Sequence, residues 1–267
     1  MRATSSRGPR IAASIWLTIA LAVAATSVAT RSSAGTDHFP GGRLSADWAV
    51  HSTGQAEYAV RDGRLVVEVP ERHSLWPLPG DNMDAPMFLL DPPPDAATVS
   101  LETRLSFAAG AETSVGAQAG LVIVRRDMQA LALLLAARGW SALMAEWADA
   151  EINTAIGGGG VAAFGAGEDL WMRFEHRGDD FAVFHKDAEQ EPWTDVTSSM
   201  NGSFPNLVHR FEPGSYLVGL FVANGMVPVD TVEVAFDYFH SPELDLRDIA
   251  PVGRLTTTWA ELRSPAP

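Results

Sequence analysis

Short segments in which apolar and polar residues alternate recur along the chain from Phe39 onward, separated by turn-forming residues. Residues 99–107 show the pattern most plainly, with an apolar side chain or threonine at every second position. A period of two is typical of a strand that buries one face. Strands are predicted at 47–51, 57–61, 64–69, 99–107, 119–126, 131–136, 142–147, 170–177, 181–186, 216–223 and 232–240.

Sustained helical periodicity is absent from the sequence. Residues 131–137 have high helix propensity, but the segment is short and lies between strand-like runs, which favours a strand. Many short strands with turns at regular spacing predict an all-β chain, an antiparallel two-sheet β-sandwich.

The segments 170–177 and 181–186 indicate a hairpin. A two-residue turn at 178–179 would pair Glu175 with Ala182. Trp171, Arg173 and Glu175 would then share one face of the strand, with apolar residues on the other. Two further glycine-containing stretches predict turns: Asp62-Gly63 a tight hairpin, and residues 157–160 a flexible turn.

Residues 1–34 have the layout of a secretory signal peptide. Arginines at 2, 7 and 10 precede an apolar run at 11–25, and small residues follow. The alternative is an uncleaved membrane anchor over 11–29, which is close to the length that spans a bilayer. Either arrangement places the rest of the protein outside the cytoplasm. Residues 35–242 would form the sandwich, and 243–267 a polar, proline-bearing tail.

The charge of the chain narrows the possible partners. The net charge is −14, and removing the three leader arginines makes it −17. A surface this acidic repels phosphate backbones, so nucleic acid is not an expected partner. The chain has no cysteine, which excludes a thiol nucleophile and any thiolate metal site.

Several segments resemble one known superfamily. Residues 170–175 (LWMRFE) are followed by 178–181 (GDDF) and by Trp193-Thr194, and residues 119–123 (AGLVI), 218–221 (VGLF) and 236–239 (FDYF) match further strands. Over about residues 40–242 the chain is similar to the concanavalin A-like lectin/glucanase superfamily. Within it, the laminin-G-like domains appended to xylosidases and arabinofuranosidases are the most similar. The resemblance implies a jelly roll of two curved sheets with a concave face available to saccharide. Members include enzymes, lectins and inert modules, so the resemblance does not fix a function.

Tryptophans supply the candidate ligand-binding residues, because indole rings stack on the apolar faces of sugars. Trp171, Trp147 and Trp140 are the candidate platforms, with Arg173 and Glu175 as polar partners on the face of Trp171. The alternative for each tryptophan is core packing. A non-catalytic, lectin-like domain that binds a polysaccharide or other glycan is the leading hypothesis, with a glycoside hydrolase and a protein-interaction or structural module as alternatives.

The weak catalytic candidates are Glu243, Asp245 and Asp248. They resemble the E-x-D-x-x-E motif of the superfamily's glucanases, in which one carboxylate is the nucleophile and another the acid. Here the last position is aspartate, and the run follows Pro242, beyond the last predicted strand. A solvated exit segment is therefore the favoured interpretation.

No cofactor or metal is predicted. Calcium is common in sandwich lectins, and Asp81, Asp84, Asp91 and Asp95 could offer oxygen ligands. Their spacing matches no known calcium loop, so solvated acidic loops are expected. The histidines also lack a metal-binding spacing.

Overall fold

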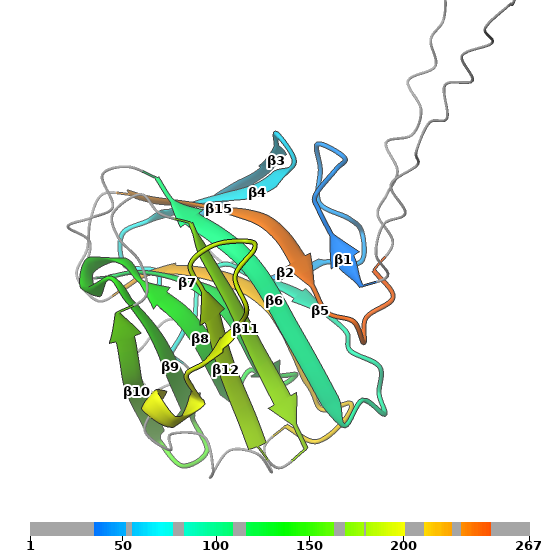
Figure 1. The fold of residues 1–267 in the computed structure, drawn as a ribbon, viewed down its shortest axis with the longest axis vertical. Coiled ribbons are helices and arrows are strands. Elements are labelled where there is room, and N and C mark those ends of the chain that lie inside the picture. The colour runs from blue at the N-terminus through cyan, green and yellow to red at the C-terminus, as the bar shows by residue number, and fades with distance from the viewer. Residues whose placement is uncertain are drawn as a thin grey trace, which may run out of the picture. The chain divides into compact units, whose positions relative to one another are not determined.

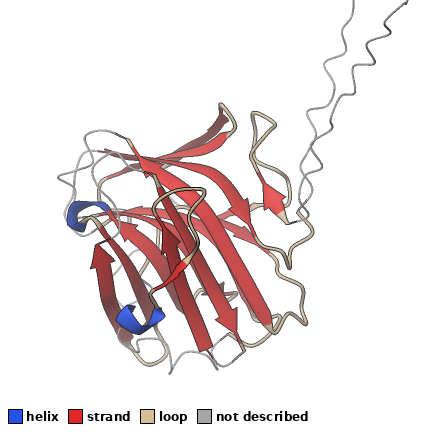
Figure 2. Cartoon of the chain, viewed as in Figure 1, coloured by secondary structure: helices blue, strands red, loops and turns tan. Residues whose placement is uncertain are grey.

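The computed structural model describes residues 35–51, 55–76, 83–108, 116–162, 169–178, 180–200, 211–225 and 231–246. These residues form antiparallel strands joined by loops and short 3-10 turns (Figure 2). The all-β, two-sheet sandwich predicted from the alternation is confirmed. No helix formed by the described residues has the length and apolar character needed to cross a membrane.

The first sheet, sheet A, has the strand order β13-β12-β11-β6-β15-β4-β3, and β1 also pairs with β15. Figure 1 shows β12, β11, β6 and β15 side by side. The bounds of its strands are β1 Thr36–Asp37, β3 Glu57–Arg61, β4 Arg64–Pro70, β6 Thr98–Phe107, β11 Leu170–Arg177, β12 Asp180–Lys186, β13 Thr194–Asp195 and β15 Thr231–His240.

The second sheet, sheet B, has the order β10-β9-β8-β7-β14-β5-β2. The turns η2 (Arg138–Trp140) and η3 (Thr197–Met200) are the described 3-10 segments. The bounds of the strands are β2 Ala49–His51, β5 Met87–Leu90, β7 Ala117–Arg125, β8 Ala130–Ala137, β9 Ala142–Asp149, β10 Thr154–Ala162 and β14 Tyr216–Asn224.

The main core lies between the two sheets. Alternate residues of sheet A, such as Leu101 and Leu105 of β6, face alternate residues of sheet B, such as Leu121 and Ile123 of β7. Sheet B is also apolar on its other face, where a second buried cluster includes Val122 of β7. Sheet A differs from sheet B, because only the face of sheet A that is turned toward sheet B is apolar. Its other face is polar and is called the outer face below.

The two predicted hairpins are confirmed. Asp62 and Gly63 have φ angles of 54° and 73°, the left-handed values that a two-residue hairpin turn requires. Glu175 pairs with Ala182 across the β11–β12 hairpin, and Phe174 pairs with Val183.

The prediction of a flexible turn at residues 157–160 is wrong. These glycines belong to β10, which pairs with β9 along its length and has a register shift between Gly157 and Gly160. Edge strands tolerate such a bulge, and glycine adopts it without steric cost.

The packed structure continues beyond Pro242. Leu244 and Leu246 are buried in the main core, and Glu243 accepts a hydrogen bond from the backbone N–H of Ser100 at 3.1 Å. The segment 243–246 is therefore not a loose tail. Residues 247–267 and the predicted leader, 1–34, lie outside the described residues.

Candidate functional site

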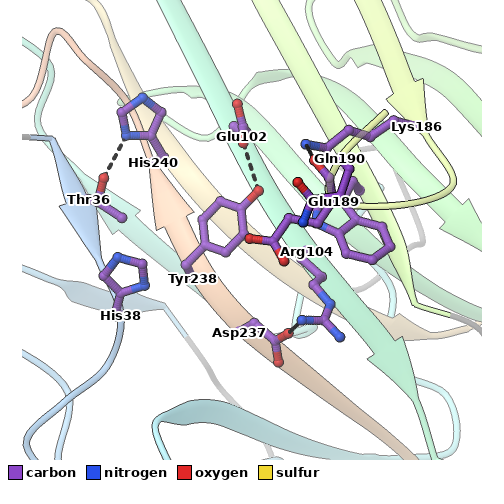
Figure 3. A pocket seen from close by; sticks show the side chains of 11 residues that line it. Thr36, His38, Glu102, Arg104, Lys186, Glu189, Gln190, Asp237, Tyr238 and His240 are labelled. Atoms are coloured by element: carbon purple, nitrogen blue, oxygen red, sulfur yellow. Dashed lines mark hydrogen bonds and ion pairs between the residues drawn. The ribbon is translucent and has the colours of Figure 1, made fainter. Parts of the chain in front are cut away.

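A cleft of about 640 Å³ lies on the outer face of sheet A (Figure 3). It crosses β11, β6 and β15, three neighbouring strands that are far apart in the sequence. Its lining combines rings with charged and polar groups. The lining residues are Thr36, His38, Glu102, Arg104, Trp171, Lys186, Glu189, Gln190, Asp237, Tyr238 and His240.

Strand alternation explains most of this lining. On β6, Leu101, Thr103 and Leu105 are buried, so Glu102 and Arg104 face outward. The same alternation on β11 turns Trp171 to the outer face, because Met172 belongs to the core.

A β-bulge on β15 supplies two cleft residues in succession. The register of β15 against β6 shifts between Phe236 and Tyr238, while Phe236 and Phe239 both remain in the core. The extra residue allows Asp237 and Tyr238 to line the cleft together, which strict alternation would forbid.

Arg104 is held between two carboxylates at the floor of the cleft. Its guanidinium contacts Asp237 at 2.7 Å and pairs with Asp169, and Asp237 also contacts Arg64 at 2.8 Å. Partial burial lowers the pKa of Arg104, but the hydrogen bond to Asp169 and the charges of both aspartates raise it by more. Burial raises the pKa of the Asp237 carboxyl, against the opposing effect of Arg104 and Arg64.

Trp171 lies beneath this arginine. The Arg104 guanidinium carbon is 4.7 Å from the indole centroid, and the residue is only 8% exposed. One indole face is therefore occupied by a cation–π contact. Trp171 lines the cleft, but it is not an open stacking platform.

Tyr238 presents a less covered ring. Its hydroxyl donates to Oε1 of Glu102 at 2.7 Å, and its ring centroid lies 6.1 Å from that of the exposed His38. Burial, followed by the charge of Glu102, raises the pKa of the Tyr238 phenol, so the hydroxyl stays a hydrogen-bond donor.

The loop after β12 forms another side of the cleft. Lys186 donates from Nζ to the backbone oxygen of Glu189 at 2.9 Å, and its ammonium lies 4.9 Å from the Trp193 ring centroid. The side chains of Glu189 and Gln190 are exposed. This rim offers a carboxylate, an amide and an ammonium group to a ligand.

Of the sequence-predicted ligand residues, Trp171 is the one that lines the cleft. Arg173 and Glu175 share its sheet face but lie outside the lining. Arg173 stacks 4.6 Å from the Phe184 centroid and 4.8 Å from that of Trp193, and Glu175 pairs with Arg173 and Arg177.

The other two tryptophans lie elsewhere. Trp147 is 2% exposed and belongs to the core between the sheets, so its position contradicts the prediction that it contacts ligand. Alternation on β9 turns it inward, because its neighbour Glu146 faces the other side of sheet B. Trp140 is 44% exposed but belongs to η2, the turn between β8 and β9 of sheet B.

Glu243 and Asp245, the described carboxylates of the glucanase-like motif, do not line the cleft. Glu243 accepts hydrogen bonds from Ser100 and from the hydroxyl of Ser241. Asp245 lines a second cleft, of about 540 Å³, with Asp47, Asp91, prolines and leucines. Asp248 lies outside the described residues.

Two of the loop aspartates considered for calcium, Asp84 and Asp91, lie at opposite ends of β5 and have different partners. Asp84 precedes β5 and accepts a hydrogen bond from the Ser74 N–H at 3.0 Å, whereas Asp91 follows β5 and pairs with Arg126. Asp95 is exposed and Asp81 lies outside the described residues. Within the described ranges, no three His, Asp or Glu side chains lie close enough together to hold a metal ion.

Sequence reasoning missed most of the cleft. The signal for Glu102 and Arg104 was present, since both occupy the polar positions of the clearest alternating strand. Glu189 and Gln190 gave no comparable signal, because the loop after β12 brings them to the cleft. Lys186 is the last residue of β12 and reaches the cleft because it pairs with Trp171 of β11. Asp237 and Tyr238 depend on a bulge that breaks the alternation.

Solved structures of other proteins share the fold of this chain. The chain superposes on the GH43 BlXynB protein from Bacillus licheniformis with a TM-score of 0.55 and 17% identity, covering 79% of this chain and 39% of that one. The xylan β-1,4-xylosidase from Bacillus halodurans superposes with a TM-score of 0.52 and 14% identity, covering 78% of this chain and 38% of that one. At these identities, the two similarities show the fold alone.

The chain spans about two fifths of the length of those two proteins. It spans 95% of the endo-1,3-β-glucanase from Streptomyces sioyaensis, which covers 79% of this chain at 14% identity with a TM-score of 0.50. No protein-family model and no curated protein matches the chain.

Proposed function

We propose that this protein binds a polysaccharide in the cleft on the outer face of sheet A. The observation that carries the proposal is the lining, in which the rings of Tyr238 and His38 lie beside carboxylate, amide and ammonium groups. Sugars present apolar C–H faces to aromatic rings and hydroxyls to such polar groups. The proposal is supported by the fold, which is shared with a xylosidase and a glucanase.

Binding to immobilised xylan and β-1,3-glucan tests the proposal. Tyr238→Ala should weaken binding about five- to thirtyfold, because losing an aromatic contact of ~1–2 kcal/mol changes affinity by that factor. Tyr58→Ala is the matched control, since Tyr58 is an exposed tyrosine of β3 outside the cleft. Equal binding by both variants and the wild type would reject the cleft as the binding site. Binding to neither polysaccharide nor a wider glycan array would favour a protein-interaction or structural role.

Glycoside hydrolysis is the second candidate. It is favoured by the likeness to the endo-1,3-β-glucanase and by Glu102 and Glu189, the two of the three cleft-lining carboxylates that form no direct ion pair with a described residue. Hydrolysis of this kind uses a carboxyl pair flanking the scissile bond. Release of reducing ends from β-1,3-glucan or xylan, lost in Glu102→Gln or Glu189→Gln, would establish it. Binding without any release would leave the protein a non-catalytic binder.

We also propose that the protein is exported, with residues 1–34 acting as a signal peptide. The charged start, apolar centre and small residues of this segment support the proposal. N-terminal sequencing of the mature protein tests it. An intact N-terminus in a membrane fraction would instead favour an anchor at 11–29.

A further inference from the structure

Neither Glu102 nor Glu189 forms a direct ion pair through its carboxylate with a described residue, although the charge of Glu189 contributes to the raised pKa of Arg104. Glu102 accepts a hydrogen bond from the neutral hydroxyl of Tyr238, and no ion pair joins it to an arginine, lysine or histidine of the described residues. Glu189 is exposed, and its backbone oxygen, not its carboxylate, accepts from Lys186. Both side chains line the cleft (Figure 3).

The other charges of the cleft floor cancel one another. Arg104 pairs with Asp169 and Asp237, and Asp237 pairs in addition with Arg64. Two arginines thus balance two aspartates. These groups leave no net charge for a ligand to meet.

Lys186 is the remaining cation of the lining. Its ammonium is engaged by the backbone oxygen of Glu189 and by the ring of Trp193. Two carboxylates against one engaged ammonium leave the cleft negative. His38 and His240 also line it, and the Nδ1 of His240 is 2.8 Å from the Thr36 hydroxyl.

The two carboxylates approach the same ring from different elements, Glu102 from β6 and Glu189 from the loop after β12. Both side chains line the same cleft as Tyr238. Burial and then the charge of Glu102 raise the pKa of the Tyr238 phenol most, and the charge of Glu189 also raises it, while that of Arg104 lowers it. An aromatic face flanked by carboxylates attracts an ammonium group through cation–π and ionic contacts. The net charge of −14 would also steer cations toward the protein.

Resting on the proposed function, we infer that the cleft selects saccharides that carry protonated amino groups, with Glu102 and Glu189 as the residues that determine this specificity. A glucosamine polymer has the required chemistry: a sugar ring to lie against Tyr238 and His38, and an ammonium group for each carboxylate. Neutral glycans can use the same rings and hydrogen-bonding groups, but they gain nothing from the two charges.

Calorimetric titration of the full-length protein with three hexasaccharides tests the inference. The ligands are β-1,4-linked glucosamine, its N-acetylated form and the glucose hexamer, in a slightly acidic low-salt buffer. The glucosamine hexamer should bind about tenfold more tightly than the other two. High salt should reduce this preference, because it screens exposed charges.

The variants Glu102→Gln and Glu189→Gln, alone and combined, should lower the affinity for the glucosamine hexamer more than that for the two neutral hexamers, so that the three affinities converge. Glutamine keeps an acceptor for the Tyr238 hydroxyl, so the fold is preserved. Glu191→Gln is the matched control, because Glu191 is an exposed glutamate of the same loop outside the lining and its loss changes the net charge equally.

Three results would overturn the inference. The first is equal affinity of the wild type for the amino and neutral hexamers, which would leave the proposed function intact. The second is a preference that survives the double substitution. The third is binding that requires calcium and disappears with a chelator, which would make the two carboxylates metal ligands. Failure to bind any saccharide would reject the proposed function itself.

Discussion

Glu146 is the residue whose chemistry fits its surroundings least. It lies on β9 facing the second apolar cluster, opposite Leu133 of β8 and next to Met144 and Ala148. It is 5% exposed, and its Oε2 has no hydrogen-bond partner. Burial raises the pKa of this carboxyl from 4.5 to about 7.

The free energy of unfolding should therefore fall as rising pH ionises Glu146. The folded state holds the proton more tightly than the unfolded chain, so the contribution of neutral Glu146 is complete below about pH 4.5 and lost as pH rises to about 7. The loss is of order 3 kcal/mol. Urea unfolding of the wild type and of Glu146→Gln at acidic and at mildly alkaline pH measures it.

Glutamine is the suitable comparison because it stays neutral at every pH while keeping the shape of the protonated acid. The variant should match the wild type in acid and exceed its free energy of unfolding in alkali. A constant difference between the two proteins across this range would contradict the assignment.

At the scale of the strands, two glycines determine how closely the strands of sheet B approach one another. A Cβ atom at Gly219 of β14 would lie 1.8 Å from the backbone oxygen of Phe88, and one at Gly120 of β7 would lie 2.1 Å from that of Leu134. These contacts involve backbone atoms, which cannot move aside like a flexible side chain.

Gly219→Ala should lower the free energy of unfolding by about 3 kcal/mol or more, because overpacking a close-packed interior strains both strands. Gly41→Ala is the matched control, since its Cβ would meet nothing nearer than 3.7 Å. Thermal unfolding of the two variants makes the comparison. Equal melting temperatures would show that sheet B can relax around the methyl group.

The strand predictions succeeded for the alternating strands of sheet A and also for β7, β8 and β14, whose continuous apolar runs are buried on both faces. They missed the short strands β1, β5 and β13 and the glycine-containing β10. β6, β11 and β15 belong to sheet A, whose outer face is polar, so their alternation is readable in the sequence. β5 (Met87–Leu90) was not predicted, because Phe88 and Leu90 enter the main core while Met87 and Leu89 enter the second cluster. A strand buried on both faces has no alternation to read, and β5, with four residues, is also too short to show the long apolar run that marks β7, β8 and β14.

The candidate site was predicted only through Trp171. The cleft depends on the order β11-β6-β15, which no local pattern specifies because these strands are far apart in the chain. It also depends on the bulge that places Asp237 beside Tyr238. Local sequence indicates which side chains face outward, but not which of them become neighbours.

At the scale of the whole sandwich, one ionic network joins four neighbouring segments of sheet A. Arg64 of β4, Asp237 of β15, Arg104 of β6 and Asp169 before β11 are linked in sequence. The side chain of Asp237 is 16% exposed, whereas that of Glu233, on the same strand, is 38% exposed in its pair with Arg61.

Asp237→Asn should therefore destabilise the protein by about 1–3 kcal/mol, because it leaves two partly buried arginines short of a counter-charge. Glu233→Gln should change stability by less than about 1 kcal/mol, as solvent screens an exposed pair. Urea unfolding measures both free energies. If Glu233→Gln lowered the free energy of unfolding more than Asp237→Asn, the ionic network would contribute little to stability.

The cleft depends on the one extra residue that the bulge inserts into β15, and not only on which residue types β15 carries. Shortening the strand by one residue at that point would restore uninterrupted alternation. Only one of the two positions now held by Asp237 and Tyr238 could then point outward, so either the clamp on Arg104 or the phenol would be lost. The sandwich could thus acquire or discard its recognition surface by a single-codon insertion or deletion, with both phenylalanines of the core left in place.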